Sequence, residues 1–245
     1  MLVKRIGEWV AQRVDGLRIA DYCLCFSGGY VVVEGPLGRA MGFAHVPRED
    51  LHGMGGEVRE PRLEEVVEML LDLNPLNRVL GLAMANAVSQ YYLGDVEPSA
   101  EVPVGREPIC LVGNMHPLAE RFRREGRAVW VFERSQELRH GSFSDVEEEL
   151  LLPRCGTLII TGMTLLNFTI DRILEMSRGL NVLTGPTAGV HPEPLRGTKI
   201  HYVASMRYNI DVATRHLKLG NYISLAVHPH LGTPYVISVN KYLEE

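Results

Sequence analysis

The feature that most constrains the fold is a pair of short apolar segments in the second half of the chain, each ending at a Thr-Gly step. Residues 158–160 lead into Thr161 and Gly162, and residues 182–183 lead into Thr184 and Gly185. A short apolar run that ends at glycine and is followed by a turn is typical of a strand in a parallel α/β sheet. We therefore predict that the two segments are adjacent parallel strands, with both Thr-Gly turns at the carboxyl edge of the sheet, where ligands bind.

The chain around these segments alternates between strand and helix patterns. Strands are expected at 109–112, 128–132, 158–160, 182–183 and 235–239, and helices at 117–125, 144–152, 165–177 and 210–219. Such alternation predicts a doubly wound, Rossmann-like parallel sheet.

The first hundred residues have a different order of patterns. A helix at 4–14 precedes three strands at 17–26, 30–34 and 39–46, and two helices follow at 63–73 and 76–93. A short meander followed by helices is an α+β pattern. Segment 94–108 contains three prolines and no periodicity, which is typical of a linker. The fold class is therefore α/β, with an α+β domain at 1–105 and a Rossmann-like domain at 106–245.

Composition excludes several classes of protein. The net charge of -5 and pI near 6.0 give no surface suited to nucleic acid. No apolar run approaches the ~18 residues that cross a membrane, and no signal peptide is visible, so a cytoplasmic location is expected. Glutamine occurs only three times, which is compatible with a thermophilic source. A homodimer is left open.

The four cysteines are interpreted as buried thiols in a reducing compartment. Cys23 and Cys25 would share one face of a strand, a geometry that could hold a soft metal. A zinc site normally needs four ligands, however, and Cys110 and Cys155 do not form a second closely spaced pair.

The first Thr-Gly turn continues through a polar cluster that forms our main candidate site. Thr164 is expected to cap the following helix, with Asn167 near the same end and Thr169 shortly after it. Hydroxyls, an amide and free backbone N–H groups would then meet beside Thr161 and Gly162, where an anion or carbonyl could bind. Ordinary capping explains the same residues equally well.

Two further positions could contribute to a site. Asn86 lies in an otherwise apolar helix, so its amide must bond a neighbouring loop or project into a polar site. Gly113 follows a strand, and Glu133 lies twenty residues later, where an acid commonly bonds a ribose hydroxyl. Because the further glycines of a dinucleotide fingerprint are missing, an exposed Glu133 and a merely topological Gly113 remain the preferred interpretation. His191, His228 and His230 are interpreted as exposed or hydrogen-bonded histidines rather than metal ligands.

At these residues the chain resembles the heavy-metal chelation domain family of uncharacterised prokaryotic proteins. The resemblance rests on the motif from Thr161 to Thr169, on Gly185-Pro186-Thr187 and on the upstream segment from Gly81 to Ala87. It implies an enolase-N-terminal-like domain, a Rossmann-like domain and an active site in the cleft between them. This chain departs from the family pattern Gly-Pro-Ser-Thr-Pro, because Ala188 and Gly189 follow Thr187.

These observations lead to one main functional hypothesis and two alternatives. The protein is expected to bind a small polar or anionic metabolite in the cleft, such as a metal chelate or its organic chelator. The proposed ligand-binding residues are Asn86, Gly113, Glu133, Thr161, Gly162, Thr164, Asn167, Thr169, Gly185, Pro186 and Thr187. No protein-ligated metal is expected, because no recognisable set of Cys, His and carboxylate ligands is present. The alternatives are an enzyme acting on a nucleotide-like or S-adenosylmethionine-type ligand, and a non-catalytic structural or partner-binding protein.

Overall fold

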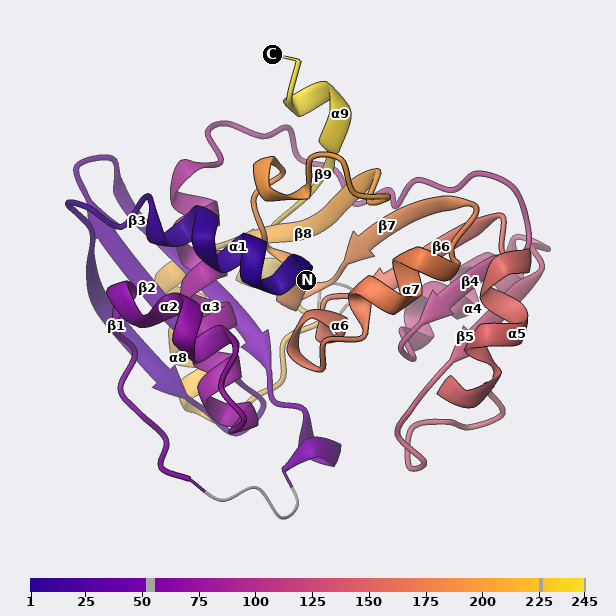
Figure 1. Cartoon of the computed structure of the whole chain (residues 1–245), viewed down its shortest axis with the longest axis horizontal. Helices are drawn as coiled ribbons and strands as arrows, with labels where there is room; N and C mark the ends of the chain where they lie inside the picture. Colours follow the sequence, from indigo (N-terminus) through magenta and orange to yellow (C-terminus); the bar gives the residue numbers. More distant parts are fainter. Residues whose placement is uncertain (52–55, 225–226, 245) are drawn as a thin grey trace.

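The computed structural model describes residues 1–51, 56–224 and 227–244, and contains two β-sheets with helices around both. Figure 1 shows the three-stranded sheet of the N-terminal half on the left and the six-stranded sheet on the right. Within the described residues, none of the helices combines the length and the apolar character needed to cross a membrane.

The first sheet is an antiparallel meander. Its strands, in the spatial order β1-β2-β3, are β1 (Arg18–Leu24), β2 (Gly28–Gly35) and β3 (Gly38–His45). The three strands predicted from alternation are therefore confirmed. One face of the sheet packs on α1 (Leu2–Ala11), α2 (Val66–Leu70) and α3 (Pro75–Tyr92), and the other face packs on α8 (Ile210–Lys218).

Helix α3 is the central element of the N-terminal half, and it is buried from Asn77 to Gln90. Pro75 opens it, and Asn74 caps it by accepting a hydrogen bond from Leu76 N. A Cβ atom at Gly42 of β3 would lie 2.1 Å from Ala87 N and 2.2 Å from Ala83 O. Only a glycine there allows the helix and the strand to approach this closely.

The second sheet has the spatial order β5-β4-β6-β7-β8-β9. Its strands are β4 (Ile109–Val112), β5 (Val129–Phe132), β6 (Thr157–Thr161), β7 (Leu180–Thr184), β8 (Tyr202–Tyr208) and β9 (Gly232–Ser238). The first five are parallel, and β9 pairs antiparallel with β8. The predicted pairing of 158–160 with 182–183 is confirmed, because Ile159 aligns with Val182 and Ile160 with Leu183.

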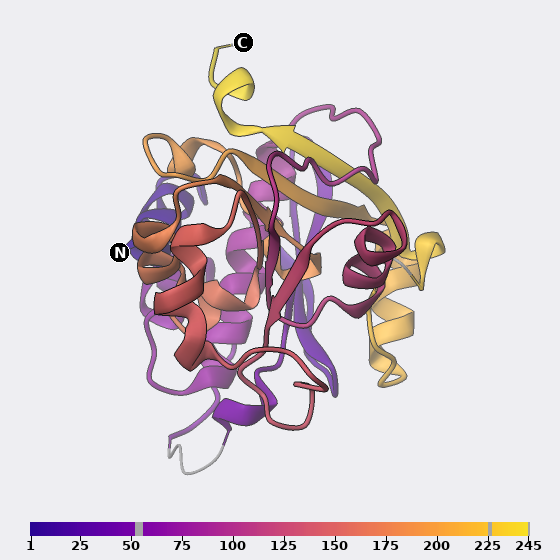
Figure 2. The ribbon, with the colours of Figure 1, turned by 90° about the vertical axis from the view of Figure 1, so that its right-hand side faces the viewer.

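Helices cover both faces of the second sheet. Figure 2, viewed from the side of β5, shows α4 (His116–Arg124) on one face and α5 (Glu148–Leu151) on the other. The face toward α4 packs Ile109, Leu111 and Ile159 against Phe122, whereas the opposite face belongs to a core that continues into the N-terminal half. The boundary that we predict at residue 105 remains a prediction, since one hydrophobic cluster spans both halves.

The structure departs from the predicted elements at several points. The expected helix at 165–177 is interrupted and becomes α6 (Met163–Leu166) and α7 (Ile170–Met176). The break occurs because Asn167 Oδ1 accepts hydrogen bonds from Thr169 N and Thr169 Oγ1, and Phe168 takes a left-handed φ of 62°. The acidic segment 144–152 forms short 3-10 turns around α5, and β8 was not predicted.

The prediction of four buried thiols is wrong, because the cysteines form two disulfides, Cys23–Cys25 and Cys110–Cys155. Cys110 lies on β4 and Cys155 just before the neighbouring strand β6, which brings their Cα atoms to 5.9 Å. Cys23 and Cys25 lie two residues apart with a Cα–Cα distance of 5.4 Å. Both distances fall within the usual disulfide range. The Cys110–Cys155 pairing could not be predicted from the sequence, because it depends on β4 and β6 being neighbours in the sheet.

Candidate functional site

The two Thr-Gly turns meet at the carboxyl edge of the second sheet. Gly162 N donates to Thr184 O at 3.0 Å, and Gly185 N donates to Ala204 O at 3.0 Å. A Cβ atom at Gly162 would lie 2.6 Å from Ala188 N, so the 3-10 turn η5 (Pro186–Ala188) packs directly on the first turn. Gly185 has a φ of 104°, a left-handed conformation that glycine adopts without steric cost. The structure thus brings together the two motifs singled out in the sequence.

The residues of the first motif divide into buried and half-buried groups. Thr164 is 2% exposed and its Oγ1 donates to Thr161 O at 2.7 Å. The N-cap of α6 is Gly162, without a side-chain cap, so the prediction that Thr164 caps this helix is wrong. Asn167 lies at the other end of α6, where it closes its own turn with Thr169. Among the polar residues of this motif, Thr161, Asn167 and Thr169 are half-buried and therefore reachable by a ligand.

Asn86 connects the two halves of the protein. Its Nδ2 donates to Phe43 O of β3 and to Thr187 O of η5, both at 2.9 Å, and the residue is 1% exposed. Because both partners are acceptors, the nitrogen must face them, which fixes the amide orientation. The remaining oxygen, Oδ1, has no hydrogen-bond partner among the described residues. Asn86 therefore bonds strand β3 and turn η5, and among the described residues its buried Oδ1 acceptor has no partner.

Three more side chains of α3 each have a buried polar atom without a hydrogen-bond partner among the described residues. Gln90 Nε2 donates to Gly189 O at 3.2 Å and to Tyr235 Oη at 2.6 Å, which leaves its Oε1 without a partner in the described part of the chain. Ser89 Oγ and Arg78 Nε are likewise buried and unpartnered there. The Arg78 guanidinium lies 5.2 Å from the ring centroid of Phe168, beside the turn formed by Asn167. Helix α3 contacts both α6 and η5, so this polar row follows the carboxyl edge of the sheet.

His45 also belongs to this junction, although it was not among the site residues predicted from the sequence. Its Nδ1 lies 2.9 Å from Thr187 Oγ1, its backbone N donates to the same hydroxyl at 3.1 Å, and its Nε2 lies 3.3 Å from Ile223 O. The ring stacks on Tyr222 with centroids 4.9 Å apart. Burial lowers the pKa of His45 to about 4, so the imidazole is neutral near pH 7.

Gly113 and Glu133 lie at the same edge, next to the first motif. A Cβ atom at Gly113 would lie 2.8 Å from Thr161 Cγ2. The carboxylate of Glu133 accepts hydrogen bonds from Asn114 N and Ser135 N, each at 2.8 Å. Both of its oxygens thus already have backbone donors, and its observed role is to fix the turn after β4 against the loop after β5.

A cavity of about 340 Å³ opens between the two halves, near the C-terminal end of α3. Arg39, Gln90, Arg207 and Tyr208 contribute its polar lining. Tyr208 Oη donates to Pro186 O at 3.1 Å, which connects this cavity to the second Thr-Gly turn. None of the ligand-binding residues predicted from the sequence is among the residues that line this cavity. Pro186 is connected to it only through Tyr208.

The histidines are placed away from this edge or in structural contacts. His191 stacks on Trp9, accepts a hydrogen bond from Glu193 N and contacts Tyr242 Oη. His228 and His230 lie beside His216, whose Nε2 is 3.0 Å from Tyr222 O. Across residues 1–51, 56–224 and 227–244, no group of three or more His, Cys, Asp or Glu side chains is arranged to hold a metal ion. The donors at the sheet edge are hydroxyls, amides and backbone N–H groups, which do not suit a bare heavy-metal ion.

Fold and site together define a class of α/β proteins. In this class, a helix that packs on a small antiparallel sheet also contacts the turns at the carboxyl edge of a larger, mostly parallel sheet. Two family models, both described as "Putative heavy-metal chelation", match residues 8–89 and 101–230. The chain belongs to this family, DUF364, and the resemblance inferred from the motifs is confirmed.

Two relatives support this membership, and a third shows the fold alone. An uncharacterised protein of Methanocaldococcus jannaschii is 31% identical over 239 residues, covering 90% of this chain and 92% of the relative. The crystal structure of a DUF364 protein with unknown function from Pyrococcus horikoshii is 34% identical, with a TM-score of 0.85 over 97% of this chain and 100% of that chain. A DUF364 structure from Desulfitobacterium hafniense, 17% identical with a TM-score of 0.71 over 96% and 98% of the two chains, shows the shared fold.

Proposed function

We propose that this protein binds a small polar or anionic metabolite where α3 meets the carboxyl edge of the second sheet. The half-buried residues Thr161, Asn167, Thr169, Gly185 and Pro186 would contact the ligand directly. Gly113 and Glu133 would border the site, while the buried Asn86, Gly162, Thr164 and Thr187 would position it. The metabolite would be an organic chelator or a metal chelate, so that a heavy metal is cargo rather than a resident ion.

The observation that supports this proposal is a row of buried polar atoms on α3 that have no partner within the described residues: Arg78 Nε, Asn86 Oδ1, Ser89 Oγ and Gln90 Oε1. Each buried polar group without a partner costs about 1–3 kcal/mol, and native proteins contain few of them. Four such atoms on one helix, beside two ligand-type turns, are expected where ligand or bound water supplies the missing partners. The row includes acceptors and one cationic group, which suits a molecule carrying both hydroxyl and anionic groups.

We also propose a cytoplasmic location. The two disulfides are compatible with it, because intracellular proteins of hyperthermophilic archaea are rich in disulfides. One relative comes from Pyrococcus horikoshii, a member of a thermophilic genus.

A thermal-shift screen tests the proposed function. The wild-type protein is mixed with free divalent metals, organic chelators, their metal complexes, nucleotides and pterins. A ligand present at a hundred times its dissociation constant should stabilise the folded state by ~2.7 kcal/mol. We expect hits among chelators or chelates, and we expect Asn167→Ala to weaken each hit.

Two matched variants locate the site. Arg39→Ala alters the 340 Å³ cavity instead of the sheet edge, and Thr214→Val removes a hydroxyl from α8 on another part of the surface. If only Arg39→Ala weakened ligand binding, the ligand would occupy the cavity, and the assignment of ligand-binding residues from the sequence would be wrong. If no ligand class shifted the melting temperature, the structural or partner-binding alternative would replace this proposal. The enzyme alternative would require an adenosyl ligand whose binding is lost in Glu133→Gln.

A further inference from the structure

The two disulfides of this protein differ in exposure and in the sequence separation of their cysteines. Cys110 and Cys155 are 0% and 4% exposed, and their bond joins residues 45 positions apart. Cys23 and Cys25 are half-buried and only two positions apart. This contrast separates a bond suited to structural stabilisation from one suited to chemistry.

The Cys23–Cys25 bond adds little to the fold. Cross-linking stabilises a protein mainly by restricting the unfolded chain, and this effect grows with the length of the closed loop. Both cysteines lie on or next to one strand, β1, so their bond ties no separate elements together. Neighbouring contacts hold this region independently: Tyr30 Oη donates to Asp21 at 2.8 Å, Lys218 pairs with Asp21 at 2.9 Å, and Ser27 Oγ donates to Asn221 O at 2.7 Å.

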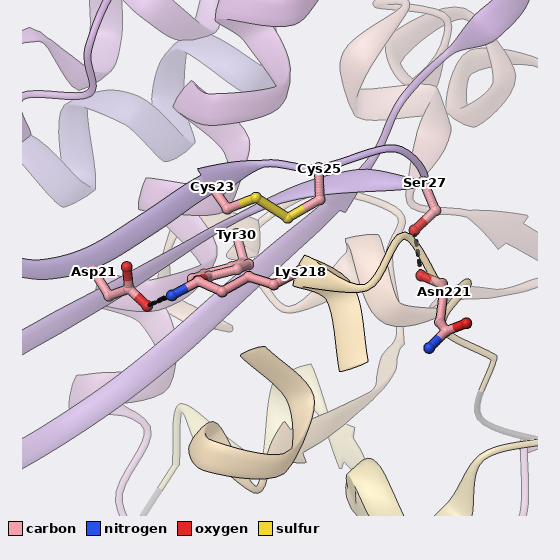
Figure 3. The surroundings of a disulfide bond; sticks show 7 residues. All are labelled: Asp21, Cys23, Cys25, Ser27, Tyr30, Lys218 and Asn221. Carbon is pink, nitrogen blue, oxygen red and sulfur yellow. Dashed lines mark hydrogen bonds and ion pairs between the residues drawn. A yellow bond between two sulfur atoms is a disulfide. The ribbon is translucent and has the colours of Figure 1, made fainter. Parts of the chain in front are cut away.

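The position of this bond leaves it partly accessible to a reactant, although both cysteines also pack against a hydrophobic cluster. β1 is an edge strand of the first sheet, and Cys25 opens the turn that leads to β2. Phe26, the next residue, is 72% exposed. Figure 3 shows the bond at this turn, near the Asp21–Lys218 ion pair and the Ser27–Asn221 hydrogen bond. Thiol–disulfide exchange requires that a thiolate reach one of the two sulfurs, and exposed disulfides are typically the labile or catalytic ones.

We propose that Cys23 and Cys25 form a redox-active dithiol/disulfide site that exchanges with low-molecular-weight thiols, whereas Cys110–Cys155 is an inert structural bond. In the first step, an external thiolate attacks one sulfur, the S–S bond breaks, and the other cysteine leaves as a thiolate that takes a proton from water. A second thiolate then attacks the external sulfur of the mixed disulfide and releases the remaining cysteine. Two thiols are oxidised to one disulfide while the protein disulfide is reduced to two thiols.

The test uses the full-length oxidised protein and glutathione as the probe. The folded protein is equilibrated in buffers with defined ratios of reduced to oxidised glutathione, quenched with acid, alkylated and mapped by mass spectrometry. We expect Cys23 and Cys25 to become alkylated at ratios that leave Cys110 and Cys155 unlabelled. The two equilibrium constants should differ at least a hundredfold, which corresponds to about 60 mV.

Single variants provide an independent measurement. Cys25→Ser should accumulate a mixed disulfide between Cys23 and glutathione while circular dichroism shows a folded protein. Cys110→Ser should leave Cys155 unmodified in its folded fraction, because that residue is buried. The proposal is overturned if both disulfides reduce only at the same ratio, if the Cys23–Cys25 bond fails to form in oxidised glutathione, or if folded Cys25→Ser is not glutathionylated. Wild-type mapping decides the question even if a variant does not fold.

Discussion

Replacing Asn86 by alanine should destabilise the protein markedly, because this one side chain connects the two halves. Its Nδ2 donates two hydrogen bonds of 2.9 Å, to Phe43 O and Thr187 O, within a buried region. Each carbonyl left without its donor costs about 1–3 kcal/mol, and removing the unpartnered Oδ1 offsets about one such cost. The net loss should be about 2 kcal/mol, which in a chain of this size lowers the melting temperature by about 4–8 °C.

The assay is guanidinium and thermal unfolding followed by circular dichroism. Asn86→Asp keeps the shape but replaces the donor with a carboxylate that faces two carbonyl oxygens, so at pH 7 it should be at least as destabilising as alanine. Asn167→Ala is the matched control. The Asn167 side chain is half-buried and, within the part of the chain that the structure describes, bonds only Thr169 of its own turn, so the loss should stay below about 1 kcal/mol. If Asn86→Ala cost no more than Asn167→Ala, the proposed connection through Asn86 would be refuted.

Three further predictions concern packing, protonation and the structural disulfide. Gly42→Ala should lower the free energy of unfolding by more than about 3 kcal/mol, because its Cβ would lie 2.1 Å from the backbone of α3. Gly105→Ala, whose Cβ would have its nearest contact at 3.5 Å, should be nearly neutral. Equal losses in the two variants would contradict this packing. Burial lowers the pKa of His191 from 6.5 to about 4. Between pH 6.5 and pH 4, His191 therefore binds a proton in the unfolded chain but not in the folded protein. The free energy of unfolding should therefore fall as pH decreases from 6.5 to 4, by up to about 1.4 kcal/mol per pH unit. If a His191→Gln variant kept the whole pH dependence in urea titrations, that dependence would not come from His191. Replacing Cys110 and Cys155 by serine should lower the free energy of unfolding by about 4 kcal/mol, as expected for a loop of this length, and a calorimetric loss below 1 kcal/mol would argue against a structural role.

Local sequence patterns were sufficient to predict the architecture. Alternation identified β1 to β3, and the apolar runs before Gly162 and Gly185 identified β6 and β7 together with their parallel pairing. Each of these signals is contained within a few consecutive residues. The helix at 165–177 failed because the apolar period continues across Asn167, whose side chain takes the Thr169 N–H that helix formation requires. Periodicity alone does not reveal such competition.

The site was less predictable, because its geometry depends on contacts between distant segments. Asn86 and Thr187 are 101 residues apart, and His45 meets Thr187 across 142 residues. One signal was available: Arg78 and Gln90 stand in the same apolar helix as Asn86, and Gln90 follows Asn86 by four residues, on the same helical face. No local pattern predicts the Cys110–Cys155 disulfide, because it depends on the order of the strands in the sheet, which places β4 beside β6.

Calorimetric titration of the strongest hit from the ligand screen tests the central claim most directly. Thr161→Val removes a single half-buried hydroxyl at the carboxyl end of β6 while preserving the side-chain shape. We predict that this variant binds the ligand at least about tenfold more weakly, a loss of about 1.4 kcal/mol, while Thr214→Val binds it as the wild type does. Unchanged affinity in Thr161→Val would contradict the assignment of the ligand site to this edge of the sheet.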